Sequence, residues 1–374
     1  MIFKNALVFN GQSFNKNDFA VSDDRFVSVS DTVLKDDIKD LDGSYVIPGL
    51  IDIHTHGNSD ADFSDGDYDG LKRMSEFYVN HGVTSFCPTS MTLPYDVLSK
   101  AFETAERFTK DASVSGARIA GIHMEGPYFS EKKKGAQNAD YLKLPDIEGF
   151  RKLYDSCGNL IKIVDVAPEL EGAAEFAASA CRLCTVSIAH TDADYNQTKA
   201  VYRAGASHLT HLFNAMPGIH HRNPGVIGAA AEEPDVSAEL ICDGLHVHES
   251  AIRMGFKLFP GRICLISDSL RCAGMPDGEY TLGGQRIHLS DNIARLDDGT
   301  IAGSAANLYQ CMLNAIRFGI DKVTAINAAT INPARAIGMS DVIGSIEPGK
   351  YADFIVCDEA LNIRSVYTGG KLYK

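Results

Sequence analysis

The sequence has no tryptophan, no long apolar run and no excess of basic residues. None of its apolar stretches approaches the roughly 20 residues that a helix needs to cross a bilayer, and the first residues lack the basic start and long apolar stretch of a signal peptide. Lys and Arg number 35 against 49 Asp and Glu, a formal net charge of −14 that disfavours a nucleic-acid or anionic-membrane surface. We therefore expect a cytoplasmic protein that binds neither nucleic acid nor membranes.

The cysteines indicate a reducing compartment. Nine are scattered over 374 residues, and Cys87, Cys242 and Cys264 stand inside apolar stretches, where a free thiol behaves as a small hydrophobe. This distribution argues against a disulfide framework. Because the chain is acidic, an anionic substrate would need a local basic pocket.

Short strands are predicted at both ends of the chain. The patterns predict strands over residues 6–9, 18–21 and 25–29, with turn signals between them, and again over 352–358, 363–367 and 371–373. Neither end has enough residues for an independent β domain. We therefore expect residues 1–47 and 342–374 to form one small β-sandwich domain together.

Between these ends, from residue 48 to 341, strand patterns alternate with helical patterns. The expected strands are residues 46–56, 83–89, 117–125, 161–169, 185–190, 207–213, 237–243 and 262–268. Helical patterns over 69–80, 95–110, 172–184, 195–204 and 248–258 separate many of them. This alternation predicts an α/β fold, a (β/α)8 barrel, whose chemistry lies at the C-terminal ends of the strands.

An insertion is expected after the eighth strand. Residues at about 275–302 have the pattern of β-hairpins around Gly-Gly and Asp-Gly turns. A helix over 307–318 should follow, and another over 323–329 that ends at Asn332-Pro333.

Six potential metal ligands stand at the ends of five predicted strands. His54 and His56 are two residues apart in a strand, so both side chains face one side and can reach one ion. The complete set is His54, His56, Glu125, His190, His211 and Asp268. Imidazoles and carboxylates at the mouth of one barrel suit one or two divalent ions, with zinc or iron favoured. Such a site polarises a carbonyl and activates water, so we predict a metal-assisted hydrolysis.

Each residue has a plainer interpretation when it is taken alone. Glu125 could be an N-cap or loop acid, and Asp268 could cap the segment after its strand. Their shared topological position favours the ligand interpretation. Six further histidines have no such consistent placement and are expected to be structural: His123, His208, His220, His221, His248 and His288.

These residues carry a family resemblance. Residues 47–56 resemble the first-strand motif of the amidohydrolase superfamily, and residues 123–127, 189–191, 210–216, 243–246 and 267–268 resemble its N-acetylglucosamine-6-phosphate deacetylase family. The resemblance runs from the first strand through Ala302-Gly303-Ser304 and includes the flanking β domain. No Lys stands where dihydroorotase-like members carry a carboxylated metal bridge. The resemblance implies hydrolysis of an acetyl group from a phosphorylated amino sugar, and a homodimer.

It also implies roles for the candidate ligands. Glu125, His190 and His211 would hold the principal ion, and His54 and His56, with Glu125 bridging, would hold a second. Asp268 would accept a proton from the attacking water and pass it to the departing amine, as general base and then acid.

The substrate contacts are likewise implied by the resemblance. His246 would hold the sugar, and Asn214, Ala215 and Arg222 the phosphate, with Arg222 reaching the site of a neighbouring subunit. Some members have a carbonyl-polarising His where this chain has Gln137, whose amide can donate a hydrogen bond but cannot carry positive charge. The role of Gln137 stays open at this point.

Two alternatives remain from the sequence. One is a different amidohydrolase activity, such as deacetylation of the epimeric substrate N-acetylgalactosamine 6-phosphate, which differs only in the direction of one hydroxyl group. The chain could also be a non-catalytic barrel that binds sugar phosphates as a sensor.

Overall fold

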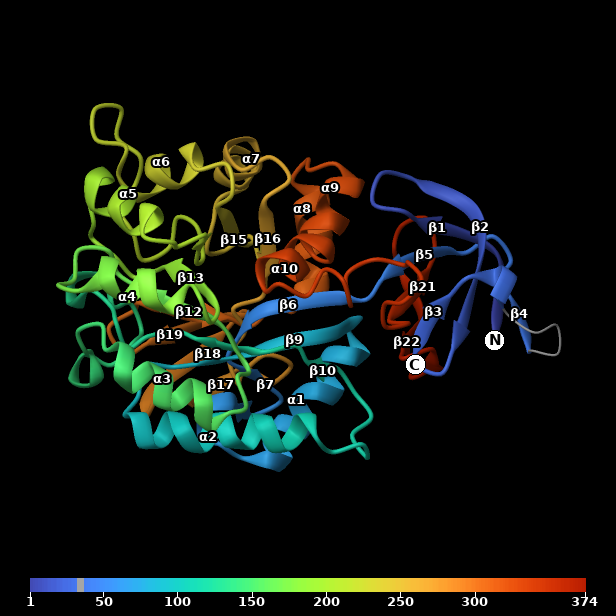
Figure 1. The fold of residues 1–374 in the computed structure, drawn as a ribbon, viewed down its shortest axis with the longest axis horizontal. Helices are drawn as coiled ribbons and strands as arrows, with labels where there is room; N and C mark the ends of the chain where they lie inside the picture. The colour runs from blue at the N-terminus through green and yellow to red at the C-terminus, as the bar shows by residue number, and fades with distance from the viewer. Residues whose placement is uncertain (32–36) are drawn as a thin grey trace.

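Eight parallel strands enclose the centre of the molecule, as the alternating pattern predicts (Figure 1). The computed structural model describes residues 1–31 and 37–374. The barrel strands in spatial order are β6 (Leu50–Thr55), β9 (Val83–Ser90), β11 (Ile122–Met124), β12 (Ile161–Val166), β13 (Thr185–Ile188), β14 (His208–Leu209), β15 (Ser237–Ile241) and β16 (Ile263–Ile266). The short β10 (Arg118–Ile119) also pairs with β9. Next to the last strand, the Asp268 backbone N–H donates to the His54 carbonyl at 3.0 Å and links the two ends of the sheet.

Helices cover the outside of this sheet. They are α1 (Tyr68–Asn80), α2 (Tyr95–Thr109), α3 (Ile147–Ser156), α4 (Ala173–Ala180), α5 (Tyr195–Arg203), α6 (Gly225–Glu232), α7 (Glu249–Leu258), α8 (Leu308–Arg317), α9 (Lys322–Ala328) and α10 (Ile331–Ala336). All seven helices predicted from the pattern form, whereas α3, α6 and α10 were not predicted. The expected stop at Asn332-Pro333 is wrong, because both residues lie inside α10. Pro333 is in the first turn of that helix, where a missing N–H leaves no intrahelical hydrogen bond unmade.

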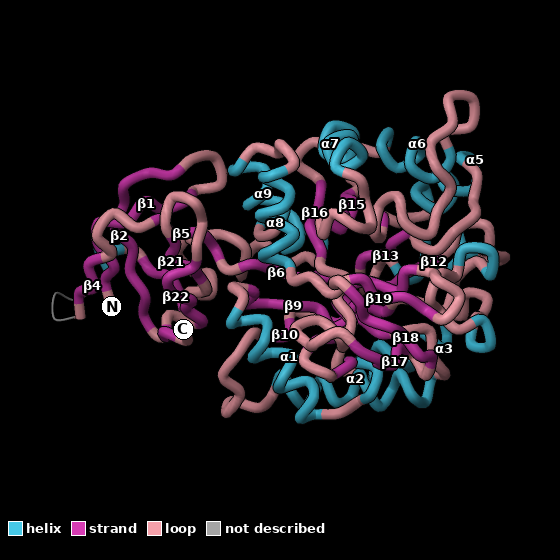
Figure 2. Tube along the Cα trace, turned by 180° about the vertical axis from the view of Figure 1, so that it is seen from behind, coloured by secondary structure: helices cyan, strands magenta, loops and turns pink. Residues whose placement is uncertain are grey.

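Strands from both ends of the chain form a second sheet at one end of the molecule (Figures 1 and 2). Its order is β23 (Lys371–Leu372), β22 (Ile363–Thr368), β21 (Phe354–Cys357), β5 (Tyr45–Pro48), β1 (Ile2–Phe9), β2 (Phe14–Ser22) and β3 (Arg25–Val27), and β4 (Ile38–Asp40) pairs with β1. Aromatic rings fill its core: Phe3 stacks on Phe19 at 4.9 Å, and Phe354 on Tyr367 at 4.4 Å. The boundaries after residue 47 and before residue 342 stay predictions.

The predicted first strand is divided between the two sheets. Tyr45–Pro48 pairs with β21 in the terminal sheet, whereas Leu50–Thr55 pairs with β9 in the barrel. The division falls at Gly49, whose N–H donates to the Asp353 carbonyl at 3.0 Å. A Cβ at Gly49 would lie 2.1 Å from the Thr84 hydroxyl oxygen, so no larger residue fits this joint without displacing Thr84.

The insertion after β16 is a four-stranded antiparallel sheet. It contains β17 (Gly278–Leu282), β18 (Gln285–Ser290), β19 (Ile293–Leu296) and β20 (Ile301–Ser304), which confirms the predicted hairpins. The remaining elements are the pair β7 (Gly57–Asn58) and β8 (Ala61–Asp62) and four short 3₁₀ turns, η1 (Val29–Asp31), η2 (Phe63–Asp65), η3 (Glu131–Lys133) and η4 (Ala139–Tyr141).

The cysteines are free thiols, as expected from the sequence. All nine lie in the described part of the chain, and none forms a disulfide. Cys181 and Cys184 have the spacing of a Cys-x-x-Cys motif, but neither belongs to a group of side chains placed to hold a metal among the described residues. Over the same residues, no helix combines the length and the apolar character needed to cross a membrane.

Candidate metal centre and active site

The six predicted ligands meet at the C-terminal mouth of the barrel. Oε1 of Glu125 lies 3.1 Å from Nε2 of His190 and 3.3 Å from Nε2 of His211. The same oxygen lies 3.6 Å from Nε2 of His54, and the other carboxylate oxygen lies 3.4 Å from Nε2 of His56. The ligand atoms thus form two adjoining groups, Glu125 with the histidines of the fifth and sixth strands, and Asp268 with the histidine pair of the first.

Each imidazole is tethered through its Nδ1 atom. His190 donates to the Lys133 carbonyl at 2.9 Å, and His56 donates to the Thr89 carbonyl at 3.1 Å. His211 likewise donates to the Asn214 carbonyl at 3.2 Å, and His54 to the Glu239 carboxylate at 2.8 Å. In a neutral imidazole such a bond places the proton on Nδ1, so Nε2 is the atom that faces the centre, as in protein sites whose imidazoles bind metals. An imidazole that is also protonated on Nε2 donates from there to a carboxylate.

The packing of these atoms fits a divalent ion. Nε2 of His190 and Nε2 of His211 are only 3.1 Å apart, and Nε2 of His54 is buried without a hydrogen-bond partner. Two nitrogen lone pairs at this distance repel each other unless a proton or a cation lies between them. Tetrahedral coordination at metal bond lengths of about 2.0–2.1 Å places neighbouring ligand atoms about 3.3 Å apart, close to the observed spacing.

The carboxylates of the centre carry negative charge. Burial would raise the pKa of Glu125, but hydrogen bonds from His190 and His211 hold the pKa of this carboxyl well below its usual value. Burial opposes ionisation of Asp268 too, yet the adjacent His54 and His56 lower its pKa. In turn, hydrogen bonding to Glu125 raises the pKa of His211 to about 9 despite burial. The centre therefore favours added positive charge.

Three of the ligands have a strained backbone. The φ angles of His190, His211 and Asp268 are 43°, 30° and 48°, in the left-handed region that residues with a side chain rarely adopt. All three follow a barrel strand by two residues, where the chain turns away from the sheet. Strain of this kind persists only where the surroundings hold it, and it concentrates at functional sites.

A cavity of about 340 Å³ opens from these ligands. Four of the predicted substrate-contacting residues line it, namely Gln137, Asn214, Ala215 and His246. Gln137 spans the cavity wall, since its Nε2 donates to Glu125 at 2.6 Å and its Oε1 accepts from the Thr92 N–H at 2.8 Å. In this arrangement Gln137 supports a predicted ligand directly.

Arg222 is the predicted site residue that does not reach this cavity. It lies on the exposed segment between β14 and α6, and its Nη1 is 2.7 Å from Nε2 of His221. The guanidinium does not line the cavity of its own subunit. A role at a phosphate would therefore require the site of another subunit.

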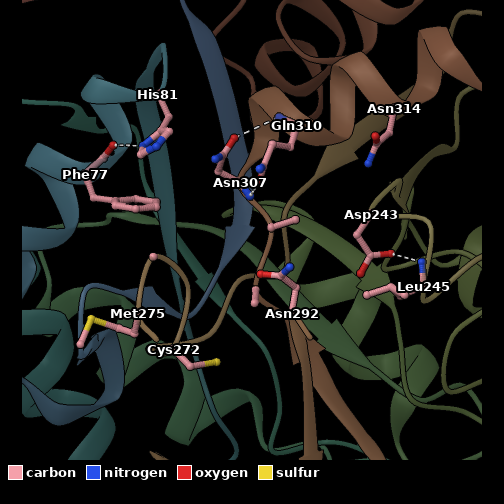
Figure 3. Close-up of a pocket in the computed structure, with 13 residues that line it drawn as sticks. Phe77, His81, Asp243, Leu245, Cys272, Met275, Asn292, Asn307, Gln310 and Asn314 are labelled. Carbon is pink, nitrogen blue, oxygen red and sulfur yellow. Dashed lines mark hydrogen bonds between the residues drawn. The ribbon is translucent and has the colours of Figure 1, made fainter. Parts of the chain in front are cut away.

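A second cavity, of about 350 Å³, is shown in Figure 3. Several polar side chains that line it already have hydrogen-bond partners within the protein. Asn307 and Gln310 form a reciprocal capping box at the start of α8, and Asn314 donates to the Cys242 carbonyl at 2.9 Å. Asp243 lines this second cavity and contacts His246, which lines the first. Its carboxylate accepts from Nδ1 of His246 at 2.6 Å, which directs the other ring nitrogen of His246 away from Asp243.

Sequence reasoning missed the buried acids beneath the centre. Glu239 in β15 contacts His54, His208 and the backbone of His211, and Asp165 in β12 accepts from His123 at 3.1 Å. The histidines expected to be structural at 123 and 208 thus belong to a polar network inside the barrel. The available signal was an acidic residue within an apolar strand, Glu239 in β15 and Asp165 in β12, an arrangement that is costly unless the charge is paired.

Several known proteins similar to this chain are deacetylases of acetylated amino-sugar phosphates. The amidohydrolase family model matches residues 45–373. The chain belongs to this family. It is 38% identical to the N-acetylglucosamine-6-phosphate deacetylase of Bacillus subtilis (strain 168), over 86% of this chain and 83% of the relative. It is 33% identical to the N-acetylgalactosamine-6-phosphate deacetylase of Escherichia coli O157:H7, over 90% of this chain and 89% of the relative.

A solved structure extends the likeness to the whole fold. An aspartate-to-alanine mutant of the Mycobacterium smegmatis N-acetyl-D-glucosamine-6-phosphate deacetylase, in complex with N-acetyl-D-glucosamine-6-phosphate, superposes with a TM-score of 0.91 at 31% identity. The match covers 100% of this chain and 98% of that one. The predicted amidohydrolase resemblance and barrel fold are thereby confirmed.

Proposed function

We propose that this protein is a divalent-metal-dependent hydrolase that converts N-acetyl-D-glucosamine 6-phosphate to D-glucosamine 6-phosphate and acetate, in amino-sugar catabolism. The observation that carries this proposal is the convergence of four tethered imidazoles, Glu125 and Asp268 at the mouth of the barrel, beside a cavity that all of them except His54 line. The deacetylase relatives named above support the choice of substrate.

The chain's own ligands divide into two sets. Glu125, His190 and His211 would hold the principal ion, and His54 and His56, with Glu125 bridging, would hold the second. Zinc and ferrous iron are the leading candidates for these nitrogen and oxygen ligands. A divalent ion held here supplies a Lewis acid that polarises the amide carbonyl and lowers the pKa of water.

Asp268 is the proposed proton carrier. Its Oδ1 lies 3.6 Å from Nε2 of His54 and 3.4 Å from Nε2 of His56, and the side chain also faces the cavity. The carboxylate accepts a proton from the attacking water as the C–O bond forms, and it returns that proton to the amine nitrogen as the C–N bond breaks. Its lowered pKa keeps it ready to act as a base near neutral pH.

Side chains on the cavity wall would hold the sugar phosphate. His246, oriented by Asp243, is proposed to bind the sugar, and Asn214 with Ala215 the phosphate. Nδ2 of Asn214 is buried without a partner in the described chain, so a donor is free for an anionic oxygen. Gln137 is proposed to contact the acetyl group, although its present hydrogen bond to Glu125 would have to be shared or exchanged.

Arg222→Ala is expected to lower kcat/KM for the phosphorylated substrate by roughly 1.5–3 kcal/mol, the range for a hydrogen bond to a charged group. Arg offers bidentate geometry to phosphate oxygens, and the acidic chain needs such a cation. Slow turnover of unphosphorylated N-acetylglucosamine should hardly change. Arg151→Ala, an exposed arginine on α3, serves as the matched control. Equal losses on both substrates would assign Arg222 to the fold or the subunit contact instead.

The proposed homodimer gives Arg222 a sharper test. If Arg222 serves the neighbouring subunit, co-expression of Arg222→Ala with Asp268→Asn creates mixed dimers in which one site has both Asp268 and a wild-type Arg222 from its partner. Activity on the phosphorylated substrate should exceed that of either variant alone. If mixed dimers form and show no gain, Arg222 does not act across the interface.

The two epimers and the metal can be tested in one series. We expect acetate release from N-acetylglucosamine 6-phosphate to disappear after treatment with a chelator and to return with zinc or ferrous iron. N-acetylgalactosamine 6-phosphate is the second candidate substrate, because one relative carries that activity. Faster turnover of the galactosamine epimer would replace the proposed substrate. Binding of either sugar phosphate without acetate release would favour the non-catalytic alternative.

A further inference from the structure

A buried carboxylate with no lysine or arginine partner lies directly beneath the candidate metal centre. Glu239 is in the middle of β15, and its residue has no exposed surface. Among the described residues, its only ion-pair partners are histidines. Taking a carboxylate out of water costs several kcal/mol unless hydrogen bonds compensate, so its contacts reveal what it holds in place.

The two oxygens of Glu239 face different parts of the structure. Oε2 accepts from Nδ1 of His54 at 2.8 Å and from the backbone N–H of His211 at 3.2 Å. Oε1 accepts from Nε2 of His208 at 3.2 Å. Oε2 thus contacts His54, a proposed ligand of the second ion, and His211, a proposed ligand of the principal ion. Oε1 contacts His208, which is not a proposed ligand.

Both hydrogen bonds to Oε2 of Glu239 help to place proposed metal ligands. The bond to His54 fixes its proton on Nδ1 and leaves Nε2, which has no partner, as the atom facing Glu125 and Asp268. The bond to His211 holds the main chain where φ is 30°, a conformation that needs external support. An anionic acceptor also increases the electron density that an imidazole offers to a metal.

We infer that Glu239 is a positioning residue that sets the tautomer of His54 and the backbone of His211, and so determines how tightly the centre holds its metal. The inference rests on the proposed metal centre. Glu239 touches neither the cavity nor the proposed substrate groups, so its effect should appear in metal binding before it appears in chemistry.

The same polar network supplies a matched control. Asp165 is equally buried, and it accepts from His123 at 3.1 Å and from the Thr210 hydroxyl at 2.9 Å. It contacts none of the proposed ligands. Asp165→Asn therefore tests what loss of a buried negative charge does to the barrel without disturbing a ligand.

The test is zinc affinity of the folded protein, measured by competition with a chromophoric chelator. Glu239→Gln removes the charge at nearly constant volume, and we expect zinc to bind about 10–100-fold more weakly, the usual effect of losing a group that orients a ligand. The ion held by His54 should be lost first. Asp165→Asn should keep wild-type zinc affinity even if it lowers the melting temperature of the protein as much as Glu239→Gln does.

The outcomes separate this inference from the proposed function. Wild-type zinc affinity in folded Glu239→Gln would overturn the inference and leave the proposed function untouched. Absence of metal binding by wild-type protein would overturn both. If Glu239→Gln does not fold, Glu239→Asp keeps the charge but withdraws it by about one C–C bond, about 1.5 Å, and the same zinc loss is expected. Unchanged affinity in that variant would again refute the role.

Discussion

Asp268→Asn is expected to lower kcat by several orders of magnitude. A single general acid–base group typically contributes roughly 10²–10⁴ in rate, and Asp268 is proposed to act in both halves of the reaction and to touch the metal centre as well. The amide of Asn is nearly the same size as the carboxylate but cannot accept and return a proton. Steady-state kinetics on N-acetylglucosamine 6-phosphate measure the effect, while substrate binding should survive.

Asp192→Asn is the control for this experiment. Asp192 is a carboxylate close to the rim of the cavity that pairs with Lys132 at 3.2 Å and contacts no proposed ligand. Its replacement should leave kcat nearly unchanged, because exposed ion pairs contribute little. If Asp268→Asn retains more than about a tenth of wild-type kcat, another residue is the base.

Glu125→Ala is expected to lose metal and activity together. Its carboxylate lies within 3.6 Å of all four proposed imidazole ligands, at 3.1, 3.3, 3.6 and 3.4 Å, so its removal opens the centre of the cluster. His54→Ala removes a ligand of the proposed second ion only, and it should keep the principal ion. Metal content by mass spectrometry, measured beside acetate release, distinguishes the two variants. Equal metal content in wild type and Glu125→Ala would refute the ligand assignment.

Most of the barrel could be predicted from the sequence because its strands are short apolar runs that alternate with helical patterns. In a parallel barrel the C-terminal ends of all strands meet at one mouth, so polar residues at those ends, such as His190 and Asp268, must lie near one another. His54 and His56 could be placed on one side because strand side chains alternate. The barrel topology alone therefore predicts that these side chains lie close together.

Other features depend on tertiary contacts that no local pattern carries. The division of the first strand at Gly49 depends on pairing with β21, which is about 300 residues later in the chain. Pro333 could not mark a helix end, because proline is tolerated in a first helical turn as well as after a last one. The contact of Glu239 with His54 joins two strands 185 residues apart in sequence. Arg222 follows the sixth-strand ligand in sequence, yet it does not line the cavity of its own chain.

The measurement that tests the central claim most directly is metal analysis of the purified protein combined with acetate release from N-acetylglucosamine 6-phosphate. We expect one or two divalent ions per chain, and one acetate released for each D-glucosamine 6-phosphate formed. Protein that carries its metal, binds the sugar phosphate and releases no acetate would contradict the proposed function.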